Sequence, residues 1–226
     1  MEKSGLIMAP KFDDVSYYLG EGELTKKTDF IKLVASKIEG NSDEEKIKNL
    51  LVWMNLNVKR KFGIKDSKKF DKTAEEILIS KERTGCSDSA VLFSTIVRAM
   101  GIPAMQILTF DKDWGVKLDK GEDTKGVFGH FYVGVFITDK DGNKRWKVID
   151  SDNPSTDINK ISVNNLRKDN RNISKRRYAF AYVRDFRDFE VDGRKLDSEH
   201  SMKYIQTKAY MESNKKDIEF DDGEVR

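Results

Sequence analysis

TGCSDSAVLFSTIVRAMGIPA, residues 84–104, contains the only cysteine of the chain, Cys86. Apolar residues recur through 90–100 with the spacing of a helix that is apolar on more than one side, and Gly101 and Pro103 would end it. The stretch therefore predicts a buried helix with a thiol at its N-terminus. Unpaired backbone N–H groups and the positive end of the helix dipole stabilise a thiolate and an oxyanion at such a position.

A lone cysteine is ordinarily a small buried hydrophobe, so the thiol needs a base before it predicts chemistry. The chain has two histidines. His130 opens an apolar run, where its side chain can point into a cleft, whereas His200 lies in a polar segment and is expected at the surface. Asp150 ends the next apolar run and would orient and polarise His130. Each residue alone has an ordinary structural explanation, but together Cys86, His130 and Asp150 predict a catalytic triad.

The turn between the two apolar runs decides whether His130 and Asp150 can meet. Asp141-Gly142 predicts a hairpin. A two-residue loop would put the two side chains on opposite faces of the sheet. A three-residue loop, 140–142, with Gly142 in the left-handed conformation, pairs residue 132 with residue 150 and makes His130 the diagonal neighbour of Asp150. The triad therefore requires the three-residue loop.

Helices are expected in the first half of the chain. The predicted apolar face of the first consists of Phe30, Leu33, Val34 and Ile38. The second is capped by Ser42 with Glu45, and its apolar face holds Ile47, Leu50, Leu51, Met54 and Val58. Thr73 with Glu76 caps a third. These helices precede the helix that begins at Cys86.

Strands are expected in the second half, at 104–110, 130–137, 144–150 and 178–183, with a polar loop at 111–127. The fold class is therefore α+β, with the helices first and an antiparallel sheet after them. The simplest organisation is a single domain, 1–226. Its core would span about 25–190, between a lead-in at 1–24 and a polar C-terminal extension at 191–226.

Composition narrows the class of protein. In 226 residues, 42 Lys and Arg oppose 39 Asp and Glu, and the net charge of +3 gives no reason to expect nucleic acid. The basic segment 167–177 lacks interleaved aromatic residues, so a solvated loop is expected there. One cysteine excludes an internal disulfide and a Cys-rich zinc site, and no other metal or cofactor motif occurs. Neither a metal nor a cofactor is expected.

No apolar run approaches the roughly 20 residues that a membrane span needs, so no span is expected. As it stands, the chain fits the cytoplasm, but an export signal removed before residue 1 would fit equally well. The sequence does not indicate an oligomeric state.

Four motifs carry a family resemblance: Gly85-Cys86, RAMGIPA at 98–104, HFY at 130–132 and WKVID at 146–150. In order and spacing they resemble the core of the transglutaminase-like superfamily, which has a papain-like fold, over about 47–152. The resemblance implies N-terminal helices packed on an antiparallel sheet, with the catalytic cysteine at a helix N-terminus. Two departures are Met105, where the family often has Arg, and 151–152, Ser-Asp in place of the frequent Pro-Thr. Neither is expected to touch the chemistry directly.

The resemblance implies a cysteine-nucleophile hydrolase or acyltransferase that acts on amide bonds of a peptide or protein substrate through a thioester. The Cys86 N–H would bind the oxyanion, with a second donor among Trp53, Asn55 and Asn57. Hydrolysis is favoured over acyl transfer because transfer needs a binding site for an acceptor amine. The alternative is a non-catalytic peptide-binding module that keeps the same fold.

Overall fold

The structure, a computed structural model, describes residues 11–61, 71–122, 129–138, 142–152, 163–165, 172–174, 177–191, 193–196 and 199–215. Its helices are η1 (Val15–Leu19), α1 (Asp29–Ser36), α2 (Asp43–Asn57), α3 (Ala74–Ser80), α4 (Cys86–Ala99), α5 (Lys112–Asp119), η3 (Phe186–Asp188) and α6 (Glu199–Lys215). Its strands are β1 (Lys59–Arg60), β2 (Glu82–Arg83), β3 (Ala104–Asp111), β4 (Phe131–Thr138), β5 (Lys144–Ile149), β6 (Val163–Asn165), β7 (Asn172–Ser174), β8 (Arg177–Val183), β9 (Glu190–Val191) and β10 (Arg194–Lys195).

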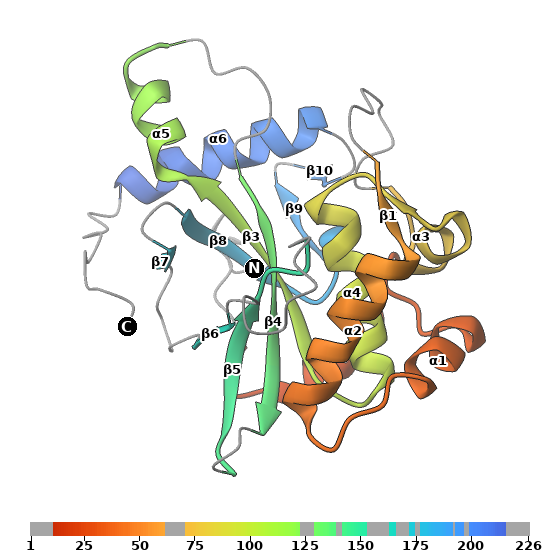
Figure 1. Ribbon diagram of the computed structural model, residues 1–226. Helices are drawn as coiled ribbons and strands as arrows, with labels where there is room; N and C mark the ends of the chain where they lie inside the picture. The colour runs from red at the N-terminus through yellow and green to blue at the C-terminus, as the bar shows by residue number, and fades with distance from the viewer. Residues whose placement is uncertain are drawn as a thin grey trace.

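The main sheet has six strands in the order β6-β5-β4-β3-β8-β7, and every neighbouring pair is antiparallel. Helices α1 to α4 gather on one side of it (Figure 1). A large apolar core fills the space between these helices and the sheet, and a smaller cluster around Tyr18 and Trp146 lies on the opposite face of the strands. The predicted α+β class and the antiparallel sheet are confirmed.

The β4–β5 hairpin has the predicted register. Val133 pairs with Ile149, which is the register that pairs residue 132 with residue 150. Gly142 has a φ of 82°, the left-handed conformation that a three-residue loop requires of its last residue and that glycine adopts without steric cost. Residues 139–141 lie outside the described part of the chain. The register brings the ends of β4 and β5 together with their even-numbered residues on one face.

Local capping explains where α2 and α3 begin. The Ser42 side chain accepts the Glu45 N–H at the start of α2, and Thr73 and Glu76 form a reciprocal capping box at the start of α3. The apolar face predicted for α2 is buried in full: Ile47, Leu50, Leu51, Met54 and Val58. Both helix starts and this face are confirmed.

The apolar face predicted for α1 is partly wrong. Phe30 and Leu33 are 41% and 51% exposed, whereas Ile31, Val34 and Ala35 are buried. Residues 31, 34, 35 and 38 also follow helical spacing, and this face of α1 packs against α4. Two apolar stripes were available on one short helix, and the tertiary contact with α4 selected the second.

Two further helices lie where the sequence predicted polar segments. Helix α5 falls within the expected loop 111–127, and α6 within the expected extension 191–226. They are joined by an edge-on contact between the rings of Trp114 and Tyr210. A Cβ on Gly115 would lie 2.1 Å from the Tyr210 ring, so only glycine allows this approach. Among the α6 side chains that the structure describes, those buried in the core are Met202, Ile205, Ala209 and Tyr210.

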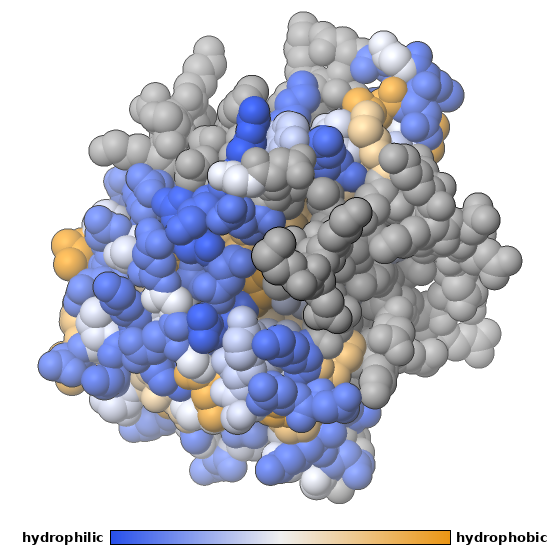
Figure 2. Space-filling model, turned by 180° about the vertical axis from the view of Figure 1, so that it is seen from behind, coloured by the Kyte–Doolittle hydropathy of each residue, from blue (hydrophilic) through white to orange (hydrophobic). Residues whose placement is uncertain are grey.

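On the face seen in Figure 2, the described residues are mostly hydrophilic. Figure 2 shows hydrophobic side chains scattered among charged ones rather than collected in one broad patch. Within the described ranges, no helix has both the length and the apolar character needed to cross a bilayer.

Arg98, near the end of α4, is a buried guanidinium. It donates two hydrogen bonds to the Ala104 carbonyl, at 2.9 and 2.7 Å, and others to the Arg184 carbonyl and Thr25 Oγ1. Burial lowers the pKa of Arg98 to about 10, partly offset by the charge of Asp185. The side chain therefore ties the end of α4 to the start of β3 and to the segment that follows β8.

Replacing Arg98 by Met is expected to lower the free energy of unfolding by about 3 kcal/mol, because it leaves buried carbonyl groups and the Asp185 charge without their cation. The matched control is Lys48→Met, which removes a partly exposed pair with Glu44 and should cost at most about 0.5 kcal/mol. Denaturant unfolding followed by circular dichroism measures both. Equal losses in the two variants would contradict this role of Arg98.

Candidate active site

Helix α4 begins at Cys86, as predicted, and the thiol is half-buried at the edge of the core. The first turn is fixed by Asp88, whose carboxylate accepts hydrogen bonds from the Thr84 N–H and hydroxyl, both at 2.8 Å. Burial raises the pKa of Asp88, and these two bonds partly oppose the shift. Because Asp88 is engaged with the segment before the helix, its side chain leaves the Cys86 N–H available at the helix end.

His130 and Asp150 meet as the hairpin register requires. The His130 Nε2 and Asp150 Oδ1 atoms are 2.8 Å apart, and the two side chains are 18% and 33% exposed. The backbone of His130 is held by Thr109 of β3, whose Oγ1 accepts the His130 N–H at 3.2 Å. Since Nε2 is engaged by the carboxylate, Nδ1 is the ring nitrogen left to face the thiol.

Tyr132 packs its ring edge-on against the imidazole, with the ring centroids 4.7 Å apart. Residues 130 and 132 lie on the same side of the chain because side chains alternate along a strand. The predicted motif of a histidine followed two residues later by an aromatic therefore has a physical meaning here. The ring of Tyr132 covers one side of the imidazole and restricts its rotation.

The charge on His130 depends on its neighbours. Burial lowers the pKa of the imidazole, but hydrogen bonds to the Asp150 and Cys86 side chains and the charge interactions with both outweigh it, and the pKa rises from 6.5 to about 10. An imidazolium at neutral pH is the form that can stabilise a thiolate and protonate a leaving group. The structure thus brings the three residues predicted as a triad into one electrostatic unit.

The sequence analysis did not predict the residues that surround Cys86, His130 and Asp150. Asp152, expected not to touch the chemistry, donates its backbone N–H to Asp150 Oδ1 at 3.2 Å. Its carboxylate accepts hydrogen bonds from Ser89 and from the buried Arg83. Arg83 precedes Cys86 by three residues and Ser89 follows it by three. The signal available in the sequence was this closeness of polar residues to Cys86 and Asp150, but it does not say which of them pair.

The three candidates for a second oxyanion donor have different surroundings. Asn57 donates its side-chain N–H to the Trp53 carbonyl at 2.8 Å within α2. Trp53 is partly buried against the core. The Asn55 side chain accepts a hydrogen bond from Arg83 at 2.5 Å and so reaches the residues around Cys86. Among the three, Asn55 has the direct link to the candidate site.

Two other features singled out in the sequence, the side chain of His200 and the basic segment 167–177, lie wholly or mostly outside the described part of the chain. His200 belongs to the first turn of α6, but its side chain lies outside the described part of the chain. Most of the basic segment 167–177 is likewise outside it. Among the residues that are described, no three His, Cys, Asp or Glu side chains are grouped as a metal site would need.

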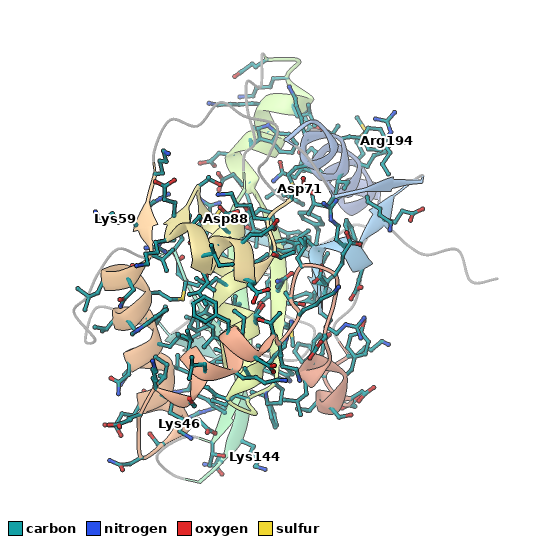
Figure 3. All side chains as sticks on the ribbon, turned by 90° about the vertical axis from the view of Figure 1, so that its right-hand side faces the viewer. Lys46, Lys59, Asp71, Asp88, Lys144 and Arg194 are labelled. Carbon is teal, nitrogen blue, oxygen red and sulfur yellow. The ribbon has the colours of Figure 1, made fainter. Side chains whose placement is uncertain are left out.

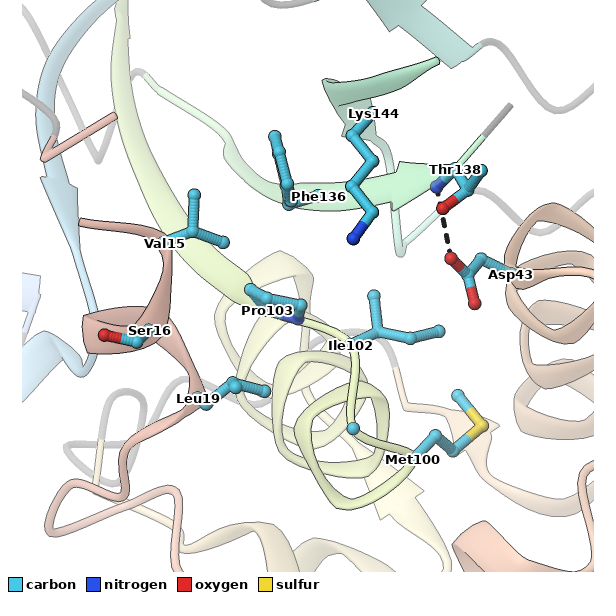
Figure 4. Close-up of a pocket in the computed structure, with 11 residues that line it drawn as sticks. Val15, Ser16, Leu19, Asp43, Met100, Ile102, Pro103, Phe136, Thr138 and Lys144 are labelled. Atoms are coloured by element: carbon cyan, nitrogen blue, oxygen red, sulfur yellow. Dashed lines mark hydrogen bonds between the residues drawn. The ribbon is translucent and has the colours of Figure 1, made fainter. Parts of the chain in front are cut away.

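A cavity of about 480 Å³ (Figure 4) is lined in part by residues near the hairpin loop of β4 and β5. His130 and Asp150 lie at the opposite ends of these strands. At the cavity, the Thr138 N–H donates to Asp43 at 3.1 Å. Figure 3 shows Asp88, in the first turn of α4, well separated from Lys144 at the rim of this cavity. The cavity is lined by Val15, Ser16, Leu19, Asp43, Met100, Gly101, Ile102, Pro103, Phe136, Thr138 and Lys144.

The sequence model of the family described as the transglutaminase-like superfamily matches residues 32–151, more than half of the chain. The chain belongs to the transglutaminase-like superfamily. The matched segment contains Cys86, His130 and Asp150, and the family resemblance predicted from the sequence motifs is confirmed.

One known protein and one solved structure are similar to this member of the superfamily. Kyphoscoliosis peptidase of Homo sapiens is 21% identical over 150 residues, which are 66% of this chain and 21% of that protein. The crystal structure of a candidate cysteine protease from Cytophaga hutchinsonii is 20% identical, with a TM-score of 0.51, and the match covers 84% of this chain and 55% of that one. This likeness confirms the fold. The chain spans about a fifth of the first relative and about half of the second.

In this superfamily member, Asp150→Asn is expected to lower the pKa of His130 from about 10, because the carboxylate that raises the pKa is removed while burial, which lowers it, remains. The sign follows from the charge: without the anion, the imidazolium releases its proton at lower pH. Nitrogen-15 NMR titration of the imidazole measures the midpoint. A His200→Gln background leaves His130 as the one histidine. An unchanged midpoint in Asp150→Asn would contradict the assignment.

Proposed function

We propose that the protein is a thiol hydrolase that cleaves peptide or isopeptide bonds, with Cys86 as nucleophile, His130 as acid and base, and Asp150 as the residue that orients and polarises His130. The observation that carries the proposal is the 2.8 Å contact between His130 Nε2 and Asp150 Oδ1, together with the influence of Cys86 on the same imidazole. Membership of the superfamily supports a cysteine hydrolase or acyltransferase in general.

The first half of the reaction forms a thioester. The Cys86 sulfur attacks the carbonyl carbon, and the carbonyl π electrons move to the oxygen. The Cys86 N–H at the start of α4 donates to this oxyanion, and Asn55 is the candidate for a second donor. As the oxyanion collapses, the carbon–nitrogen bond breaks and the His130 imidazolium gives its proton to the departing amine.

The second half releases the acyl group. Neutral His130 takes a proton from a water molecule, whose oxygen attacks the thioester carbon. The carbon–sulfur bond then breaks, the thiolate re-forms beside the imidazolium, and the carboxylic acid product leaves. Asp150 keeps Nδ1 of His130 directed at the thiol through both halves by holding Nε2.

Acyl transfer to an amine uses the same first half and differs only in the nucleophile of the second. An amine must reach the thioester before water does, which requires a binding site for the acceptor. Hydrolysis is therefore the proposed reaction. The non-catalytic alternative, a module that binds peptides without cleaving them, needs neither a nucleophilic thiol nor an imidazolium. The two proposals therefore differ in the reactivity expected of Cys86.

Native Cys86 is expected to react with iodoacetamide at pH 6 faster than the same thiol in urea-unfolded chain, because the neighbouring imidazolium and the helix end stabilise the thiolate. The single cysteine makes intact-mass spectrometry a direct readout, since the thiol can add at most one group. His130→Ala should remove the acceleration, and the control His200→Ala should retain it. A native rate at or below the unfolded rate would favour the peptide-binding module.

Asp150→Asn is expected to reduce kcat on a fluorogenic peptide amide strongly, by up to about 10⁴-fold as in a serine protease, and by less where the thiolate is already formed. Cys86→Ala should abolish turnover. Adding hydroxylamine to the wild-type reaction should divert the acyl group to a hydroxamate, which detects the thioester. An Asp150→Asn enzyme within twofold of wild type would remove Asp150 from the mechanism.

A further inference from the structure

A polar cluster is buried directly behind the candidate catalytic residues. Arg83, Ser89 and Asp152 are each at most 3% exposed. Ser89 Oγ and Asp152 Oδ1 are 2.8 Å apart, and Arg83 Nη1 contacts Ser89 Oγ at 3.0 Å and Asp152 Oδ1 at 3.4 Å. On its outer side Asp152 pairs with Arg60 at 2.9 Å. The cluster thus joins β1, β2, the first turn of α4 and the segment after β5.

Burying the charged groups of Arg83 and Asp152 is energetically unfavourable. Removing a carboxylate and a guanidinium from water costs several kcal/mol per ion, and apolar residues of similar volume often give equal or greater stability. Burial lowers the pKa of Arg83, and the charge of Asp152 opposes that shift. The stability of the fold alone therefore does not explain why an ion pair is buried here. The residues next to the pair indicate another role.

Arg83, Ser89 and Asp152 each lie close in sequence to a proposed catalytic residue. Asp152 follows Asp150 by two residues, and its N–H donates to Asp150 Oδ1, the same oxygen that accepts from His130. Ser89 lies one helical turn beyond Cys86. Arg83 also donates to the Ser151 carbonyl at 3.2 Å. The segment that carries Asp150 is thus fastened to the helix turn that carries Cys86.

We propose that Arg83 and Asp152 are positioning residues, which hold the Asp150 carboxylate on His130 and fix the end of β5 against the N-terminus of α4. This inference rests on the proposed catalytic function and extends it to residues that touch neither the substrate nor the reacting atoms. Ser89 is the link between the two charged groups and the helix.

The decisive variant is Asp152→Asn, which keeps the shape of the side chain and removes its charge. Without the charge of Asp152, Arg83 keeps only its hydrogen bonds to the neutral groups of Asn55, Ser89 and Ser151, so the end of β5 is held less firmly. A displacement near 1 Å at a catalytic group can cost about 10²-fold in rate. We expect kcat to fall about 10- to 100-fold with KM within about twofold, because the defect affects the catalytic acid and base rather than substrate binding.

A double-mutant cycle separates positioning from general damage to the fold. In an Asp150→Asn background the effect of Asp152→Asn on kcat should largely disappear, since Asp152 acts through the Asp150 carboxylate. A structural defect would instead give the same fold-loss in both backgrounds. The matched control is Asp185→Asn, the same change at another fully buried aspartate, whose carboxylate accepts from the Leu24 N–H and Thr25 Oγ1. This control should leave kcat and the His130 titration unchanged.

The NMR titration of His130 gives a readout that does not depend on turnover. In Asp152→Asn the midpoint should fall from about 10 towards 6.5, as the hydrogen bond from His130 to Asp150 weakens. If wild-type protein shows no turnover and no thiol activation, the proposed function fails, while this titration still decides the positioning role. Should Asp152→Asn not fold, Ser89→Ala removes only the hydroxyl link and should shift kcat and the titration in the same direction. An unchanged titration in the folded variant, or additive losses in the cycle, would overturn the proposal.

Discussion

The hydrogen bond between His130 and Asp150 is the interaction on which the candidate site depends, and it depends in turn on the register of the β4–β5 hairpin. Side chains alternate between the faces of a sheet, so a slip of one residue would turn Asp150 away from His130. Gly142 at a φ of 82° sets the loop that prevents this slip. A glycine at the loop end of the hairpin therefore affects the geometry at the end that carries His130 and Asp150, because β4 and β5 keep one register along their length.

Two buried arginines fix the opposite ends of α4. Arg83, just before the helix, contacts Ser89 and the segment that follows β5, and Arg98, near its end, donates to the Ala104 carbonyl and the Arg184 carbonyl. A planar guanidinium with five donors can bind several backbone and side-chain acceptors at once, which a lysine cannot do with the same geometry. The apolar flanks of α4 supply the driving force for burial, and the two arginines join the ends of the helix to the neighbouring segments.

The parts of the fold that sequence predicts are those set by local chemistry. Caps at Ser42 and Thr73, the helix from Cys86 and the hairpin register all follow from neighbours in the chain. Helix α5 and helix α6 were missed because their apolar residues are separated by charged ones, and the contact of Trp114 with Tyr210 that orders them joins distant segments. The Arg83–Asp152 pair was missed for the same reason: the sequence shows both residues, but only the folded chain shows that they meet.

The environment of His130 bears on the choice between an enzyme and a peptide-binding module. Burial is the largest influence on its pKa and acts against the charged form, yet Asp150 and Cys86 outweigh it. Keeping a half-buried imidazolium requires a precisely placed carboxylate, and that carboxylate is itself fastened by the Asp152 N–H. A site that only binds a peptide does not need this charge, and neutral polar groups would cost less free energy to bury. Proton transfer to a leaving amine, by contrast, requires an acid held beside the thiol. The proposed roles of Cys86 at the start of α4, His130 just before β4 and Asp150 just after β5 account for a charge that peptide binding alone does not need.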